Sequence, residues 1–158
     1  METETATRWL SDTEQCAWRT YLDVNRLLTY QMEKDLQPFG LTMNDYEILV
    51  NLSESADRRM RMSDLAAATL QSKSRLSHQI TRMENAGLVR REHCESDRRG
   101  LYAVLTDHGT ETMQKVAPHH VESVRQHFID MLTPEALADL RASLTPVADH
   151  LRGRRGKL

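Results

Sequence analysis

The chain has 158 residues, of which 39% are apolar, so it is long enough to bury the core of one ordinary domain. Its longest apolar runs span only a few residues, far fewer than the roughly 20 that cross a bilayer, and the first ten residues lack the apolar core of a signal peptide. Two cysteines are too few to hold a fold of this size together by disulfides. We therefore expect a single domain that works in the cytoplasm.

The formal net charge of −2 hides an uneven distribution of charge along the chain. Ten basic and five acidic residues lie between Arg58 and Arg99, which gives this segment a charge of +5. The remaining eleven basic and eighteen acidic residues sum to −7. A basic middle in an acidic chain confines any attraction for a polyanion to one segment, although a solvated charged face is the simpler alternative.

The first part of the chain predicts two helices. Apolar residues that recur at spacings of three and four predict a helix from Ser11 to Leu36. Pro38 and Gly40 end it. A second helix begins at Thr42, which resembles a capping box with Asp45 three residues later.

The basic middle predicts two further helices that follow a charged connection, Arg58 to Arg61. Ser63 is a suitable N-cap for a short, alanine-rich helix over Asp64 to Thr69. A turn of about four residues separates it from a helix over Lys73 to Ala86, and Gly87 stands where a left-handed C-cap is expected. A short helix, a turn and a second helix in this order are typical of a helix–turn–helix.

Two strands and two long helices complete the expected fold. Leu88 to His93 and Leu101 to Leu105 read as strands joined by a polar hairpin loop, Cys94 to Gly100. Thr106 can cap a long helix that extends to Leu132, and Thr133-Pro134-Glu135 is a strong signal for the start of the last helix. The sequence therefore predicts a mainly α fold with a small antiparallel β wing.

The helix over Lys73 to Ala86 carries the candidate functional residues. Its apolar side chains lie on one face, and the opposite polar face contains no acid. In a major groove, arginine can donate to guanine and glutamine can bond adenine, while the start of a helix can contact phosphates. A solvated amphipathic helix is the alternative. The residues that we assign to the groove and the adjoining backbone are Ser72, Lys73, Ser74, Arg75, Ser77, His78, Gln79 and Arg82.

The hairpin loop favours DNA over an ordinary solvated face. Arg98 and Arg99 stand near its tip, and Asp97 can fix the turn or orient an arginine. Arginine presented on a thin hairpin is attracted by a narrow minor groove. We therefore assign both arginines to DNA and Asp97 to the orientation of Arg99.

These residues carry a resemblance to a known family. Gly87-Leu88-Val89-Arg90-Arg91, followed by Asp97 to Thr106, resembles the MarR family of winged helix–turn–helix transcriptional regulators, whose wing has Asp-x-Arg and then a hydrophobic strand that ends in Leu-Thr. Ser63-Asp64-Leu65-Ala66 resembles the start of the family's first motif helix. The matching wing positions are Asp97, Arg99, Leu105 and Thr106.

The resemblance implies a homodimer that binds palindromic double-stranded DNA. Residues 11–36 and 107–151 would form a helical dimerisation region, residues 42–106 the winged DNA-binding lobe, and residues 152–158 a flexible basic tail. Two-fold symmetry places the recognition helices in successive major grooves, ~34 Å apart, with Arg99 in the flanking minor groove. Repression is the family default.

A small aromatic or amphipathic ligand commonly switches proteins of this family. The matching region of this chain would be the first helix, the second helix and the start of the fifth. An ordinary apolar core is the alternative interpretation. The residues that could supply aromatic walls and a cation for a carboxylate are Trp18, Arg19, Tyr21, Met43 and Tyr46.

Cysteines raise a second possible mode of control. Cys16 lies near the start of a helix, where its pKa can fall, and Cys94 precedes the wing loop, where we expect it to be exposed. An oxidant-sensing regulator is therefore an alternative to a ligand-controlled one, and incidental thiols are the simpler interpretation of both residues.

Metal, cofactor and enzyme functions find little support in the sequence. His119, His120 and His127 share a helix, but no zinc-ligand motif occurs and a polar outer face explains them. The chain has no glycine-rich phosphate loop, nucleophile motif or paired carboxylates. We expect no cofactor and no enzyme activity. The remaining alternative, a dimeric interaction module that does not bind DNA, would carry acids on the recognition helix.

Overall fold

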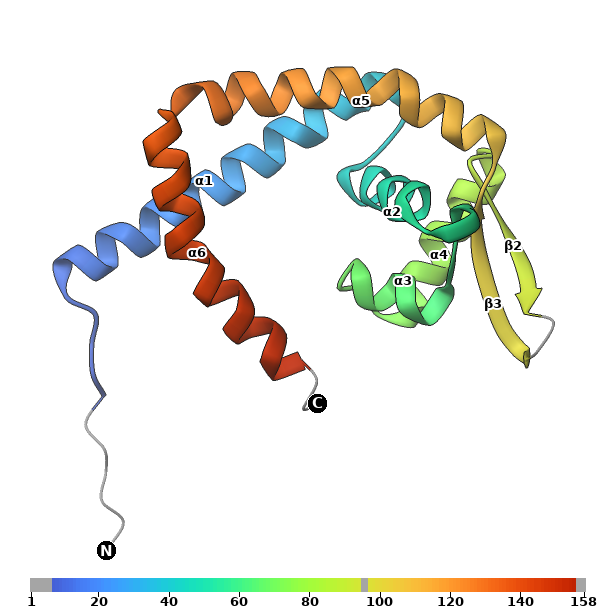
Figure 1. Ribbon diagram of the computed structural model, residues 1–158, viewed down its shortest axis with the longest axis horizontal. Coiled ribbons are helices and arrows are strands. Elements are labelled where there is room, and N and C mark those ends of the chain that lie inside the picture. The colour runs from blue at the N-terminus through green and yellow to red at the C-terminus, as the bar shows by residue number, and fades with distance from the viewer. Residues whose placement is uncertain (1–6, 95–96, 156–158) are drawn as a thin grey trace, which may run out of the picture.

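The computed structural model describes residues 7–94 and 97–155, with the side chains of 97–99 and 155 left out. Three long helices form an arm and the middle of the chain forms a lobe. Figure 1 shows the lobe below one end of helix α5 and helix α6 hanging from the other end. The arm helices are α1 (Asp12–Leu36), α5 (Asp107–His127) and α6 (Pro134–Arg155).

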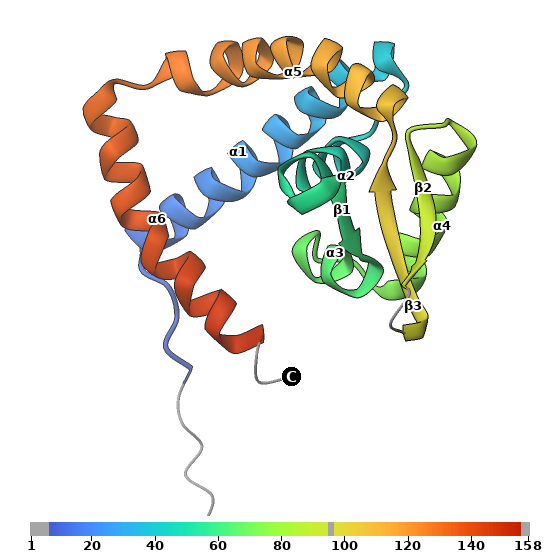
Figure 2. The ribbon, with the colours of Figure 1, turned by 45° about the vertical axis from the view of Figure 1, so that its right-hand side comes forward.

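Three helices and a three-stranded antiparallel sheet build the lobe. The strands lie in the order β1-β3-β2, and Figure 2 shows β1 beside β3. The lobe elements are α2 (Met43–Glu54), β1 (Arg59–Arg61), α3 (Met62–Ala68), α4 (Lys73–Asn85), β2 (Val89–Cys94) and β3 (Asp97–Leu105). Single 3₁₀ turns are η1 (Gln37–Phe39), η2 (Ala56–Arg58) and η3 (Ile129–Met131).

One apolar core joins the lobe to the arm. All three helices of the lobe and the sheet bury side chains in it, and α1 and α5 close it from above. Its fully buried members include Leu36, Ile48, Leu49, Leu52, Leu65, Leu76, Ile80, Met83, Leu105 and Val116. Non-directional apolar contact of this kind supplies most of the stability of a domain of this size.

Most expected elements are confirmed. The Thr42–Asp45 capping box is present, Thr106 caps α5, and Gly87 adopts the left-handed conformation with φ +74°. Ser72, which was assigned only to DNA, also caps α4. The expected winged helix–turn–helix is therefore the observed lobe.

Five features differ from the expected ones. The connection Arg58 to Arg61 contains strand β1, because its three residues pair with the distant strand β3. Helix α3 starts at Met62, so Ser63 lies inside it and is not its N-cap. Strand β3 starts at Asp97, which shortens the hairpin, and α5 ends at His127. Helix α6 extends to Arg155, into the segment expected to be flexible.

No helix within residues 7–94 and 97–155 is both long enough and apolar enough to cross a bilayer.

Two helices of the lobe end in the same motif with different residues. At the end of α3, Gln71 N donates to Ala66 O (3.0 Å) and Leu70 N to Ala67 O (3.4 Å). At the end of α4, Leu88 N donates to Met83 O (3.0 Å) and Gly87 N to Glu84 O (2.8 Å). Both are Schellman motifs, in which the residue after the cap is left-handed. Leu70 therefore occupies, at φ +57°, a conformation that favours glycine.

We predict that Leu70→Gly stabilises the protein by about 0.5–1 kcal/mol, because relief of the left-handed strain exceeds the added entropy of the unfolded chain. The Leu70 side chain is 68% exposed, so its removal loses little apolar contact. Thermal unfolding should show a midpoint about 2 °C higher. Leu70→Ala keeps the strain and is the control; a glycine variant no more stable than the alanine variant would contradict the assignment.

Candidate nucleic-acid interface

The start of α4 presents an exposed polar surface free of acids. Ser72 Oγ accepts from Arg75 N (3.2 Å), which fixes the first turn, and Leu76, Ile80 and Met83 attach the helix to the core. The side chains exposed on the first two turns are Lys73, Ser74, Arg75, Ser77 and His78. These are five of the residues assigned to DNA from the sequence, and α4 brings them together.

Gln79 and Arg82, also assigned to DNA, point to a different partner. Gln79 Nε2 donates to Asp45 Oδ1 (3.0 Å), and Arg82 Nη2 donates to the same oxygen (2.5 Å). Burial alone raises the pKa of Asp45, but hydrogen bonds from Thr42, Gln79 and Arg82 together hold that pKa below its usual value. The carboxylate is therefore ionised at neutral pH and ties α4 to α2.

Arg91 of strand β2 holds the other flank of α4. Its Nη2 donates to Ser77 O (2.7 Å) and Thr81 Oγ1 (3.1 Å), and its Nη1 pairs with the Glu84 carboxylate. The backbone N–H of Arg91 also donates to Glu84 (2.8 Å). The wing and α4 are thus fixed to each other along two helical turns.

A basic hollow of about 350 Å³ lies between the start of α4 and the hairpin. Arg61 of β1, Lys73 of α4 and Arg91 of β2 line it together with the hydroxyls of Ser63 and Ser77. Cations from three elements therefore converge beside the exposed turns of α4. We name this cavity the basic hollow.

The expected wing residues can be placed only by their backbone. Asp97, Arg98 and Arg99 belong to strand β3. Their side chains lie outside the described part of the structure, as do residues 95 and 96. The roles assigned to the two arginines and to Asp97 stay predictions.

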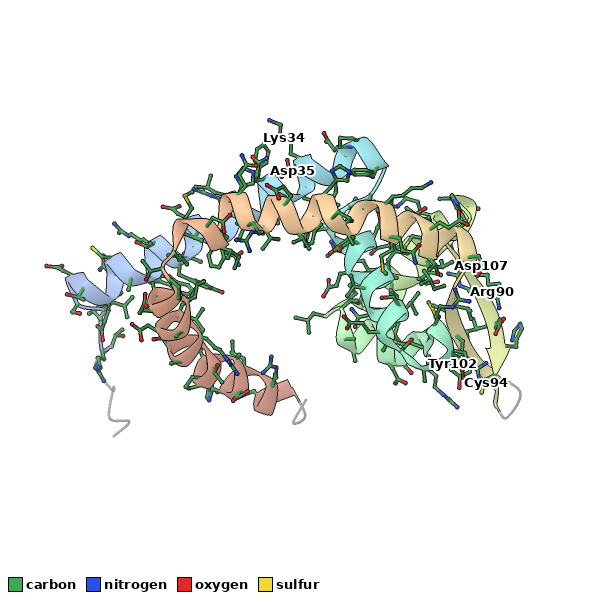
Figure 3. The ribbon with its side chains drawn as sticks, turned by 45° about the horizontal axis from the view of Figure 1, so that its top comes forward. Lys34, Asp35, Arg90, Cys94, Tyr102 and Asp107 are labelled. Atoms are coloured by element: carbon green, nitrogen blue, oxygen red, sulfur yellow. The ribbon has the colours of Figure 1, made fainter. Side chains whose placement is uncertain are left out.

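The expectation that Cys94 is exposed is wrong. Cys94 is buried at the distal end of the hairpin, near Tyr102, as Figure 3 shows. Arg61 Nη2 lies 3.5 Å from its sulfur. Tyr102 Oη lies 4.0 Å from the same sulfur, so the side chains of Arg61 and Tyr102 help to cover Cys94. Cys16 is exposed on α1.

Within the described residues, those proposed for a ligand lie in two separate places. Trp18 and Tyr21 stack at 5.8 Å between ring centroids and line a groove between α1 and α6. Tyr46 is buried in the core of the lobe, and Met43 packs against that core. Arg19 is exposed on α1. Ligand-controlled release of DNA therefore stays a prediction from the family resemblance.

The three histidines of α5 contact three different neighbours and do not form one polar outer face. His119 packs on Phe39 (5.0 Å between centroids), His120 on Tyr46 (4.4 Å), and His127 Nε2 lies 3.7 Å from Asp35 Oδ2. Burial lowers the pKa of His120. In the part of the chain that the structure describes, no three His, Cys, Asp or Glu side chains are grouped to hold a metal ion.

Comparisons with known proteins identify the family to which this winged lobe belongs. The model of the MarR family matches residues 39–100. The HTH-type transcriptional regulator PecS of Dickeya dadantii (strain 3937) is 32% identical over 136 residues, which cover 84% of this chain and 80% of PecS. The chain belongs to the MarR family. It is therefore a DNA-binding transcriptional regulator and not an enzyme. The family resemblance of the wing and motif residues is confirmed.

Two solved structures from Streptomyces coelicolor share the whole architecture. AbsC, a MarR family transcriptional regulator, is 80% identical with a TM-score of 0.89, over 93% of this chain and 99% of AbsC. Sco3205, a MarR family transcriptional regulator solved in complex with DNA, is 44% identical with a TM-score of 0.88, over 92% of each chain. The mainly helical fold with an antiparallel wing is that of this family.

Three residues of the interface were not found by sequence reasoning: Asp45, Arg61 and Arg91. The sequence identified Asp45 only as a helix cap, because its partners lie 34 and 37 residues away. Arg61 and Arg91 were counted in the basic segment, but no contact was assigned to either of them. The sequence offers one signal for a contact of this kind: Glu84 is the only acidic residue on α4.

We predict that Arg91→Met lowers the free energy of unfolding by about 1–2 kcal/mol, because it removes charge-assisted hydrogen bonds to Glu84 and to α4. Urea denaturation measures the change. Arg90→Met is the matched control: Arg90 is the neighbouring strand residue and pairs with Glu92 at an exposed position, so its loss should cost under about 0.5 kcal/mol. Equal effects of the two variants would show that Arg91 does not hold α4.

Proposed function

We propose that the chain acts as a homodimer that binds palindromic double-stranded DNA. The start of α4 enters the major groove, and the hairpin enters the flanking minor groove. The observation that carries this proposal is the acid-free, exposed surface on the first two turns of α4, beside the basic hollow. The DNA-bound structure of the 44% identical Sco3205 supports it.

The basic hollow suits the DNA strand that separates the two grooves. A protein that reaches into both grooves with a helix and a hairpin must seat the intervening backbone between them. Arg61, Lys73 and Arg91 line that position with the hydroxyls of Ser63 and Ser77. Cations and hydroxyls are the groups that contact phosphates in DNA-binding proteins.

The arm supports the dimer because, in the described chain, α1 and α6 leave large apolar side chains exposed to solvent. Trp18 and Tyr21 of α1 and Val147 and Leu151 of α6 line a largely apolar groove of about 700 Å³. Trp18 is 52% exposed and Val147 53% exposed. Helix α6 makes no extensive contact with another helix or strand of the described chain. Helices gain most of their stability from packing, and large apolar patches mark interfaces.

A second copy of the chain fits this surface. The exposed apolar faces of α1 and α6 lie on the same arm, beside each other (Figure 1). A two-fold axis can therefore place α1 and α6 of one protomer against α6 and α1 of the other, so that the same patch is buried twice. Two lobes related by that axis favour a palindromic site.

We predict that Val147→Glu makes the protein monomeric at micromolar concentration, because it places a charge in the apolar groove. Sedimentation equilibrium measures the change. Ala142→Glu is the control, since residue 142 lies on the opposite face of α6. A dimer that persists in the Val147 variant would contradict the proposed interface.

DNA selected by the wild type from a random pool should contain an inverted repeat with half-sites about 10 base pairs apart. We predict that Arg75→Ala binds this DNA about ten- to a hundredfold more weakly, the effect of losing one base contact of about 1–3 kcal/mol. Fluorescence anisotropy at several salt concentrations measures the affinities.

Arg26→Ala is the control for this measurement, because Arg26 is an exposed arginine of α1 on the face away from the groove. An unchanged affinity of the Arg75 variant, or selected DNA without a repeat, would contradict the proposed mode of binding.

A further inference from the structure

Asp45 is the one charged side chain that the described part of the chain buries. It is 1% exposed, and its carboxylate accepts from Thr42 N (2.9 Å), Gln79 Nε2 (3.0 Å) and Arg82 Nη2 (2.5 Å). A buried charge is costly unless it is paired and hydrogen-bonded, and this one has both kinds of partner. Its two side-chain partners lie on α4.

The first turn of α2, which carries Asp45, is itself firmly held. Thr42 and Asp45 form a reciprocal capping box, and Met43 N donates to Glu33 Oε1 of α1 (3.1 Å). Tyr46 packs on His120 of α5. The turn that carries Asp45 is therefore a fixed point, joined to α1 and α5, from which the direction of α4 can be set.

Gln79 and Arg82 lie behind the turns that enter a groove. They follow Lys73 by six and nine residues, which places them about 9 and 13 Å along the helix axis. Recognition helices contact base edges with their N-terminal residues, and a major groove is about 8.5 Å deep. Arg75 and His78 lie on the first two turns and are exposed.

We propose that Asp45 is a positioning residue for DNA recognition. Asp45 fixes the orientation of α4 through its hydrogen bonds with Gln79 and Arg82. Arg75 and His78, on the turns before these two residues, then contact the bases. This inference rests on the proposed DNA-binding function. It gives Gln79 and Arg82 a different role from the base contacts that their side chains suggest.

The geometry sets the consequence of losing the charge. Asparagine at position 45 keeps the shape, and its one side-chain oxygen can still accept from Thr42 N. Its NH2 group then replaces the oxygen that accepts from Gln79 and Arg82, and the Arg82 side chain, which is 54% exposed, can turn to solvent. The helix then keeps its reading residues and loses its fixed direction. Specific binding should suffer, while non-specific attraction to phosphates, which needs no fixed orientation, should remain.

The test compares Asp45→Asn and the double variant Asp45→Asn/Arg82→Gln with the wild type. The double variant removes both charges, so no unpaired buried charge remains in it. Asp23→Asn is the control, because Asp23 forms an exposed ion pair on α1 with Arg26. For each protein, anisotropy gives the affinity for the selected duplex and for an unrelated duplex at several salt concentrations, selection from a random pool gives the preferred bases, and thermal unfolding confirms the fold.

We expect Asp45→Asn to lower the affinity for the selected duplex about tenfold relative to the unrelated duplex, equivalent to about 1.4 kcal/mol. The preferred base at each position and the salt dependence should match those of the wild type. The double variant should bind no more weakly than the single one, because both act through the same contact.

Three results would overturn the inference. A changed preferred base in the double variant would show that Arg82 reads DNA, and a salt slope lower by about one would show that it contacts a phosphate. A lower unfolding temperature with unchanged affinities for both duplexes would show that Asp45 has only a structural role. If the wild type binds no DNA, the proposed function fails as well; if it binds and only these outcomes appear, this inference alone fails.

Discussion

The orientation of helix α4 is the constraint on which the rest of the lobe depends. Leu76, Ile80 and Met83 attach one face of α4 to the core, but apolar contact is non-directional and tolerates rotation of a helix about its axis. Hydrogen bonds are directional. Asp45 on one flank and Arg91 on the other supply them, from α2 and from β2 respectively. The exposed side chains of the first two turns gain a fixed direction from these two charged groups.

The end of α4 is joined as tightly to the arm. Thr106 Oγ1 donates to Gly87 O (2.7 Å) and accepts from Gly109 N (2.9 Å), so one side chain links the C-terminus of α4 to the start of α5. A Cβ at Gly109 would lie 2.1 Å from Leu88 O, which explains why glycine stands at this position. Helix α5 of the arm is therefore attached directly to the helix that we propose enters the DNA groove.

Much of this architecture could be predicted because it depends on residues close together in the sequence. Capping residues such as Thr42, Ser72 and Thr106 mark helix starts within three residues, and the wing motif is contiguous. What could not be predicted rests on pairs distant in the sequence. Strand β1 exists because it pairs with β3 more than 40 residues later, and its three residues are too few for their alternation to identify a strand.

The candidate site likewise contains residues that the sequence predicts and contacts that it does not. The exposed polar residues of α4 follow from helical spacing alone, whereas the partners of Gln79 and Arg82 follow from the packing of α2 on α4. The ligand residues expected from the resemblance also depend on tertiary structure, and their role stays a prediction. Trp18 and Tyr46 share a chemical type but lie in the arm groove and in the core of the lobe, and only tertiary structure separates them.

A dimethyl sulfate footprint on the selected duplex tests the central claim most directly, since this reagent methylates guanine N7 in the major groove and adenine N3 in the minor groove. With a dimer that inserts the start of α4, we expect protected guanines in two clusters about 10 base pairs apart, flanked by protected adenines where the wings lie. A single cluster, or protection in the minor groove alone, would contradict the account.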